Sequence, residues 1–156
     1  MVASATLRRR IEAQGFRGLD DDTLSRIGPW LRWSPVLCTV VMIAGVALQS
    51  APVLWSLAGV ALLGAVLPFH PFDLLYNHGL RHLTGTGALP RQGPQRRFAC
   101  AVATAWLFAT GLAFHQGDAM VGTLLGIPLI LVAGLVSLTN ICIPSMLHNR
   151  LFAQGR

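Results

Sequence analysis

The sequence predicts an all-α integral membrane protein: a four-helix bundle of two hairpins, with an interfacial amphipathic helix in the central cytoplasmic loop. Of its 156 residues, 53% are hydrophobic and 12% are charged, whereas a soluble domain usually carries roughly 25% charged residues. Two long apolar blocks are separated by a polar segment, residues 70–97. All twelve basic residues are arginines, and they lie outside the apolar spans.

The first apolar block predicts a helical hairpin. Its first span covers about residues 33–49 and follows the motif WLRW, whose amphipathic rings suit the headgroup layer. Pro52 suits the first helical position of a second span, about 52–69. One long helix kinked at Pro52 and ending in a re-entrant return is the alternative. A helix needs roughly twenty residues to cross the hydrocarbon layer, and the length of this block therefore favours two spans.

The second apolar block predicts another hairpin, with spans at about 98–114 and 119–143. Pro128 should bend the last span because it removes one backbone hydrogen bond, and Pro144 should end it. The chain thus divides into an N-terminal cytoplasmic segment (1–29), one membrane domain (30–152) and a tail (153–156). We expect the first nineteen residues to be a solvated basic tail with a short helix at about residues 7–13.

The distribution of arginine predicts the orientation. The two short turns hold no arginine, and the N-terminal segment, the central loop and the C-terminal region hold all twelve. Because arginine resists translocation, those three regions should lie in the cytoplasm. The prediction is a bacterial inner-membrane protein with four spans and both termini in the cytoplasm.

The start of the central loop has the period of an amphipathic helix that lies flat in the interface. Its apolar arc contains Phe72, Leu75, Tyr76, Leu80 and Leu83, and its polar arc contains Asp73, Asn77, His78, Arg81 and His82. Contact with lipid headgroups or a partner is predicted for Arg91, Arg96, Arg97, Phe72 and Tyr76.

Two kinds of side chain could bind a metal. His78 and His82 stand four apart on one helix flank, but two imidazoles do not close a coordination sphere, and His70 or His148 could join them only through tertiary folding. We therefore predict no metal site and no cofactor. The cysteines Cys38, Cys100 and Cys142 should lie at similar depth, where three thiols could capture a soft metal or exchange sulfur. Cysteine is also a common small buried residue, and that interpretation is favoured.

Small residues recur at four-residue steps and predict close helix packing. They are Gly122 and Gly126 in one span and Ala101, Ala105 and Ala109 in another. Packing within the bundle is favoured over an interface with a partner subunit or a second copy, because a bundle needs such contacts in any case.

Several functions are disfavoured. The predicted spans contain no charged residue and no histidine, which argues against a proton-coupled transporter or a charge-selective channel. No nucleophile is paired with a base, so no catalytic residue is predicted. Nucleic-acid modules are missing. The expected partners are the lipid bilayer and a membrane protein or a second copy.

Two motifs carry a family resemblance. The central loop ends GPQRRFA (93–99), and the chain closes with CIPSMLHNRLF (142–152). With two spans before the loop and two after it, the sequence resembles the uncharacterised bacterial integral membrane proteins grouped as DUF4395, over about residues 25–152. The resemblance implies a small four-helix inner-membrane protein and supplies no activity.

The function predicted by elimination is a non-catalytic accessory or assembly subunit of a larger membrane complex. The first alternative is a protein that handles soft metal or reactive sulfur through Cys38, Cys100 and Cys142. The second is a redox module associated with quinone or haem.

Overall fold

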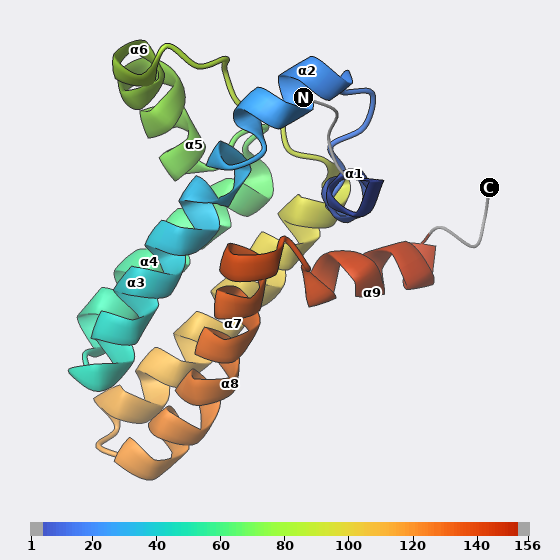
Figure 1. Cartoon of the computed structure of the whole chain (residues 1–156). Coiled ribbons are helices and arrows are strands. Elements are labelled where there is room, and N and C mark those ends of the chain that lie inside the picture. The colour runs from blue at the N-terminus through green and yellow to red at the C-terminus, as the bar shows by residue number, and fades with distance from the viewer. Residues whose placement is uncertain (1–4, 153–156) are drawn as a thin grey trace.

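Four long helices make up the body of the protein. The computed structural model describes residues 5–152, and all regular elements in this range are helices. The predicted tail 153–156 lies outside the described residues. Helices α3 and α7 each pack mainly against α4 and α8, and the two hairpins lie side by side (Figure 1). The bounds are Trp33–Ala47 for α3, Ala51–Val66 for α4, Pro94–His115 for α7 and Ala119–Thr139 for α8.

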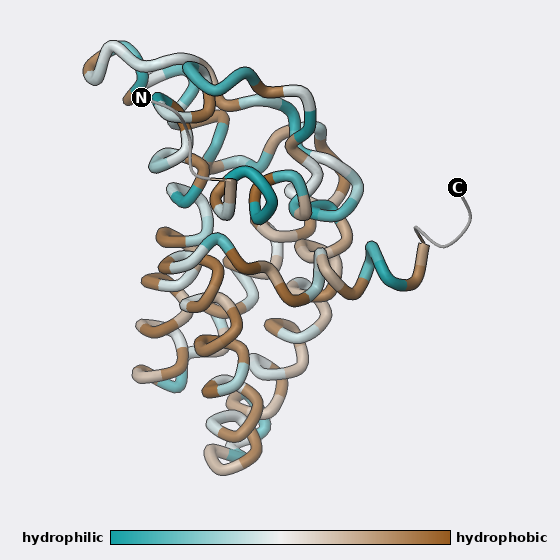
Figure 2. Tube along the Cα trace, turned by 45° about the vertical axis from the view of Figure 1, so that its right-hand side comes forward, coloured by the Kyte–Doolittle hydropathy of each residue, from teal (hydrophilic) through white to brown (hydrophobic). Residues whose placement is uncertain are grey.

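These helices have the length and composition of membrane spans. Three of them, Trp30–Ala47 (α3 with the preceding 3₁₀ turn η1, Trp30–Arg32), α7 and α8, are long and apolar enough to cross a membrane. Helix α4 passes that test only together with the segment 71–84, which follows a bend of 81°. Figure 2 shows the long helices as predominantly hydrophobic, and the end of the molecule near the N-terminus as more polar. The chain is therefore a membrane protein.

The last long helix ends earlier than predicted. The expected span 119–143 stops at Thr139, because Asn140 adopts the left-handed conformation (φ 58°) that ends many helices. Pro144 does not terminate this span. It lies in the first turn of a separate helix, α9 (Ile143–Phe152), where a missing backbone N–H is tolerated. Helix α9 leaves the end of α8 sideways and packs against α7 (Figure 1).

The central segment is helical, but its predicted amphipathic faces are wrong. It consists of α5 (Pro71–Leu75), a π-helical turn η2 (Tyr76–Leu80) and α6 (Arg81–Thr84). The predicted apolar residues Leu75 and Leu83 are exposed, whereas Asp73 and Asn77 are buried. Asn77 can be buried because it exchanges two hydrogen bonds with the backbone of Leu89. The wider π turn also rotates the residues after it out of α-helical phase.

The N-terminal segment is folded onto the rest of the protein. The short helix expected at about residues 7–13 is present, but the expectation of a solvated tail is wrong for the described part. Helices α1 (Ala5–Ala13) and α2 (Asp21–Ile27) pack over the polar end of the long helices. Burial of apolar area explains this, since these side chains form a second core with residues of the central segment. The members of this core are Ile11, Phe16, Leu24, Ile27, Leu31, Tyr76 and Leu89.

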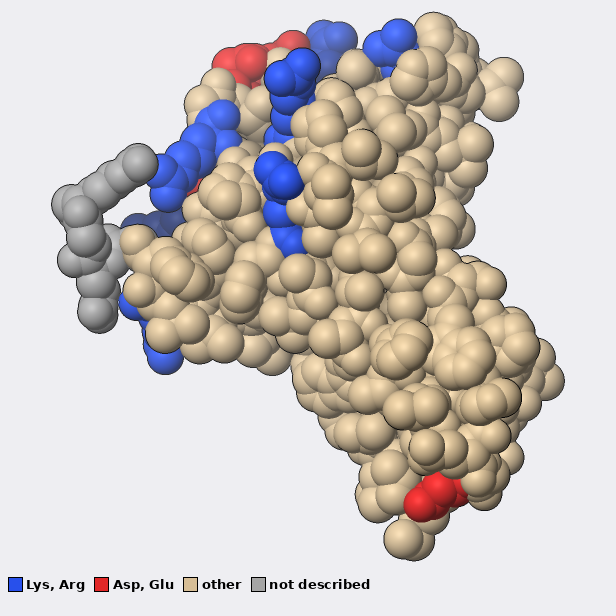
Figure 3. Space-filling model, turned by 180° about the vertical axis from the view of Figure 1, so that it is seen from behind, with Lys and Arg blue, Asp and Glu red and all other residues tan. Residues whose placement is uncertain are grey.

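Three side chains tie the N-terminal segment to the end of α8. Arg10 donates to the carbonyl of Thr139 (2.9 Å), Gln14 to that of Asn140 (2.8 Å) and Arg32 to that of Leu138 (3.0 Å). These carbonyls are among those left without an intrahelical partner at a helix C-terminus, where positive charge is also favourable. The segment therefore caps α8. Arginine atoms gather toward this end of the molecule, and none is visible on the lowest part of the face in Figure 3.

Candidate functional site: a cavity lined by three cysteines

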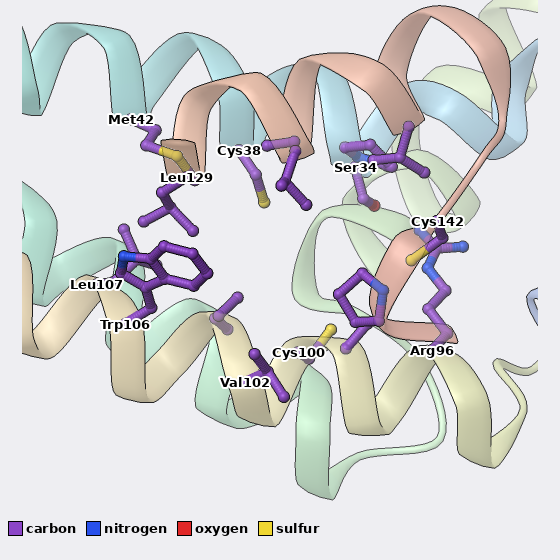
Figure 4. A pocket seen from close by; sticks show the side chains of 18 of the residues that line it. Ser34, Cys38, Met42, Arg96, Cys100, Val102, Trp106, Leu107, Leu129 and Cys142 are labelled. Atoms are coloured by element: carbon purple, nitrogen blue, oxygen red, sulfur yellow. The ribbon is translucent and has the colours of Figure 1, made fainter. Parts of the chain in front are cut away.

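A cavity of about 150 Å³ lies among the four long helices, in the half nearest the arginine-bearing end. Figure 4 shows it between α3 and α8 on one side and α4 and α7 on the other. Its deeper walls are apolar and include Met42, Leu57, Trp106, Leu107 and Leu129. Ser34, His70 and Arg96 line it at the other end. The cavity thus joins an apolar interior to a polar rim.

All three cysteines line this cavity as free thiols. Cys38 comes from α3, Cys100 from α7, and Cys142 from the link between α8 and α9. The sulfurs of Cys38 and Cys100 both point into the space between the helices (Figure 4). Ser145 donates a hydrogen bond to the sulfur of Cys142 (3.1 Å), which holds the third thiol in place.

Helical spacing aligns the cavity residues along their helices. Ser34 precedes Cys38 by four positions and Arg96 precedes Cys100 by four, so each pair lies on one helix face. Cys142 reaches the cavity because α8 ends at Thr139 and the chain changes direction at Asn140. The third thiol therefore depends on a helix end that the sequence pattern alone did not locate.

His70 lies beside Cys38 with a defined tautomer. Its Nδ1 accepts the backbone N–H of Phe72 (3.3 Å) and caps α5, so the ring hydrogen of the neutral imidazole is assigned to Nε2. Nε2 stands 3.9 Å from the sulfur of Cys38. His70 lies between α4 and α5, and burial lowers its pKa to about 4, with the charge of Arg96 adding to the effect and that of Asp73 opposing it. The imidazole is therefore neutral near pH 7 and can donate to a Cys38 thiolate.

Gly64 of α4 makes room for this arrangement. A Cβ at Gly64 would stand 2.6 Å from Cδ2 of His70 and 3.2 Å from the sulfur of Cys100. Real Cβ atoms do not approach other atoms as closely as 2.6 Å. Because Gly64 has no side chain, His70 and Cys100 can both pack against α4 at this position.

A buried ion pair lies at the rim. The guanidinium of Arg96 is 3.5 Å from the carboxylate of Asp73, and the two side chains are 7% and 1% exposed. Asp73 also accepts a hydrogen bond from Ser34. Arg96 stands over the ring of Phe16, with 5.3 Å to the centroid. Among the described residues, both terminal nitrogens of Arg96 are buried without a hydrogen-bond partner, so part of the hydrogen-bonding capacity of this guanidinium is unused.

The two histidines considered as metal ligands in the sequence lie outside the cavity. His78 and His82 are exposed on the central helical segment. His78 is within 2.9 Å of the carbonyl of Leu74, and His82 accepts a hydrogen bond from Arg81. Neither lines the cavity. Within residues 5–152 no three His, Cys, Asp or Glu side chains are placed so that they could hold a metal ion.

The residues expected to contact headgroups have different surroundings. Arg91 is exposed near the ring of Phe69. Arg97 donates to the carbonyls of Ala65 and Val66 (both 2.8 Å) at the end of α4.

The aromatic residues of that predicted set are drawn into the protein. Tyr76 is fully buried, with 5.0 Å between its ring centroid and that of Trp30. Phe72 is half-buried against the main core and beside His70. With Arg96 also buried, three of the five predicted contacts point into the fold. The central segment docks through a face that combines Phe72 and Tyr76 with Asp73 and Asn77.

The small residues fall into two groups. Gly122 faces the ring of Phe114 and Gly126 faces Val46, so both allow close helix contacts inside the protein. Ala101, Ala105 and Ala109 are exposed along the outer face of α7.

The three cysteines were identified from the sequence. The buried ion pair of Asp73 with Arg96, and the close approach that Gly64 allows, were not. One signal was present: Arg96 lies four residues before Cys100, at a helix start that Gly93 and Pro94 mark. The predicted span began at residue 98, which left Arg96 in the loop.

The fold and the cavity define a small all-α membrane protein with a cluster of half-buried thiols toward one end of its spans. The family model "Domain of unknown function (DUF4395)" matches residues 29–152, and the chain belongs to this family. The match covers the four long helices, α9 and every cavity-lining residue except Gln14, and begins just after α2. No curated protein and no solved structure matches the chain.

Proposed function

We propose that this protein handles reactive sulfur species through the thiols that line its cavity. The observation that carries the proposal is the convergence of Cys38, Cys100 and Cys142 from three separate parts of the chain on one cavity. A thiolate is the nucleophile that accepts or passes on a sulfur atom. The neutral His70 at 3.9 Å can donate a hydrogen bond to a Cys38 thiolate, which favours Cys38 as the reacting thiol.

The charge at the rim supports a sulfur species over a soft metal cation. Arg96 lines the same cavity as the thiols and its counter-ion Asp73 does not, so the charge nearest the cavity is positive and disfavours a cation in a medium of low dielectric constant. The same charge attracts anionic sulfur compounds. Handling of soft metal therefore has less support than handling of sulfur.

The proposed setting is the inner membrane of a bacterium, crossed four times with α4 as the shorter second span. The arginine-bearing end, with the cavity beside it, would face the cytoplasm because arginine resists translocation. Sulfur species made in the cytoplasm would then reach the thiols without crossing the whole bilayer.

The test is retention of sulfur by the reduced protein in detergent after exposure to inorganic polysulfide, measured by intact mass. We expect added sulfur atoms on the wild type and their loss in Cys38→Ser, with smaller losses in Cys100→Ser and Cys142→Ser. The matched control is Ala101→Cys in a chain with all three native cysteines changed to Ser. This thiol sits beside position 100 on the exposed face of α7 and should not retain sulfur. Equal retention by the control and the wild type would refute a built site.

A second candidate is an accessory or assembly subunit of a larger membrane complex. The observation in its favour is the exposed row Ala101, Ala105 and Ala109 on α7, since small residues let another helix approach closely. Mild solubilisation from native membranes, with identification of what migrates with the protein, tests it. Replacement of Ala105 by Leu should release a partner that docks there. The same preparation would show the visible absorption of a haem.

A further inference from the structure

We propose that the cavity binds a small oxyanion that carries a sulfane sulfur, of the thiosulfate class, with Arg96 holding the oxyanion end and Cys38 receiving the sulfur. The inference rests on the proposed sulfur function and names its substrate. Two independent features of one cavity carry it: a cluster of nucleophilic thiols, and a buried guanidinium with unpaired nitrogens at the rim.

The unpaired nitrogens of Arg96 point to an anion. Its side chain is 7% exposed and lines the cavity, yet neither terminal nitrogen has a hydrogen-bond partner among the described residues. Buried charged donors without acceptors are costly and are rarely left so. The carboxylate of Asp73 does not satisfy them at 3.5 Å, and it is also engaged by Ser34. Acceptor atoms must come from an occupant of the cavity.

The shape of the donor favours an oxyanion. A guanidinium presents its N–H groups as a planar fork, which matches two oxygens of one anion. The rest of the cavity is apolar and thiol-lined, so the other end of the ligand should be a soft, weakly hydrated atom such as sulfur. A volume of about 150 Å³ has room for on the order of five water-sized atoms, the size of a thiosulfate ion.

The step balances without any further reagent. The Cys38 sulfur attacks the outer sulfur of thiosulfate, a sulfur–sulfur bond forms to Cys38, and the sulfur–sulfur bond of thiosulfate breaks. Sulfite leaves with the bonding electron pair and takes the thiol proton, and Cys38 is left as a persulfide. His70, whose Nε2 lies 3.9 Å from the Cys38 sulfur, stabilises the attacking thiolate by donating its Nε2 hydrogen. Arg96 holds the oxygens that depart with sulfite.

The experiment is a single-turnover reaction of the reduced protein in detergent with sodium thiosulfate. Released sulfite is measured together with the intact mass. We expect about one sulfite per chain and one added sulfur atom on Cys38, with both signals lost in Cys38→Ser. Excess sulfate, an oxyanion that thiols do not attack, should slow the reaction by competing for Arg96. A rate insensitive to sulfate means that only water satisfies these nitrogens, and the inference is then overturned.

Variants of the ion pair separate the role of Arg96 from the reactivity of the thiols. The double variant Asp73→Asn/Arg96→Gln removes both charges, so neither partner is left buried alone. With thiosulfate it should react at least about tenfold more slowly, the loss of one charge-assisted hydrogen bond. With the uncharged disulfide dithiodipyridine it should react as the wild type does. If the double variant does not fold, Arg96→Lys keeps the charge and removes the fork, and should also be slower.

The outcomes are distinct for the two proposals. An equal thiosulfate rate in the folded variants overturns the binding role of Arg96. A wild type that releases no sulfite, while Cys38 still reacts with dithiodipyridine and retains sulfur from polysulfide, overturns the thiosulfate class and leaves the sulfur function standing. Thiols inert to all three reagents remove both proposals.

Discussion

The carboxylate of Asp73 and the guanidinium of Arg96 face each other at 3.5 Å, almost completely buried, although Asp73 was predicted on the polar arc of an interfacial helix and Arg96 in a loop. The pair joins the central segment to the start of α7 at the rim of the cavity. Ser34 of α3 hydrogen-bonds to the same carboxylate. Three separate parts of the chain are therefore held together by one carboxylate.

The first prediction concerns this pair. Asp73→Asn leaves the Arg96 charge buried without a counter-charge, and we expect a loss of about 3 to 5 kcal/mol in the free energy of unfolding. The double variant Asp73→Asn/Arg96→Gln should recover a large part of that loss, since no unpaired charge remains. Denaturant unfolding in detergent micelles measures both. Additive losses in the two single variants and the double variant would show that the two charges are not coupled.

The second prediction is a dependence of stability on pH that comes from His70. The unfolded chain takes up a proton near pH 6.5, whereas His70 in the folded protein does so only near pH 4. As the pH falls from 6.5 to 4, the unfolded state binds more protons, so stability decreases, by up to about 3 kcal/mol. His70→Asn keeps an acceptor that can cap α5 and removes the titration, and should flatten the curve.

The control for that experiment is His82→Asn, because His82 is exposed. Unfolding midpoints at a series of pH values between 4 and 7 should be the same for this variant as for the wild type. If the stability of His70→Asn depends on pH in the same way as that of the wild type, the dependence comes from another group.

The third prediction concerns the contact between α4 and the cavity. Gly64→Ala places a methyl group 2.6 Å from the His70 ring and 3.2 Å from the Cys100 sulfur, and displacement of either side chain should cost about 1 to 3 kcal/mol. The rate of Cys100 alkylation by a small maleimide should change as well. Gly59→Ala lies on the same helix with nothing within 4 Å of its new Cβ. It should be neutral or slightly stabilising.

The fourth prediction concerns the N-terminal segment. Gln14→Ala removes a buried hydrogen bond to the carbonyl of Asn140 at the end of α8, and leaving that carbonyl unpaired should cost about 1 to 3 kcal/mol. Because Gln14 also lines the cavity, thiol alkylation should become faster. Arg9→Ala, at an exposed position of α1, is the comparison and should change neither quantity. Unchanged alkylation in Gln14→Ala would mean that this residue does not help to close the cavity.

The fifth prediction is the orientation in the membrane. In a chain whose native cysteines are changed to Ser, Gln116→Cys in the α7–α8 turn should react with a membrane-impermeant maleimide added to intact cells. Arg91→Cys, in the loop between α6 and α7, should react only after permeabilisation, because the arginine-bearing side faces the cytoplasm. The reverse pattern of labelling would invert the topology, and labelling of both positions in intact cells would exclude it.

The sequence by itself determined the membrane class, the number of long helices and the family, because apolar length and the location of arginine depend on composition along the chain and not on contacts. It also named the three cysteines. Only the tertiary structure decided that the chain turns at Asn140 and brings Cys142 to Cys38 and Cys100, and that Arg96 is buried against Asp73. It also decided that the central segment buries Asp73 and Asn77 beside Tyr76. The physical reason is that hydropathy counts a charged or amide side chain as exposed, whereas a partner from a distant segment can satisfy it in the interior.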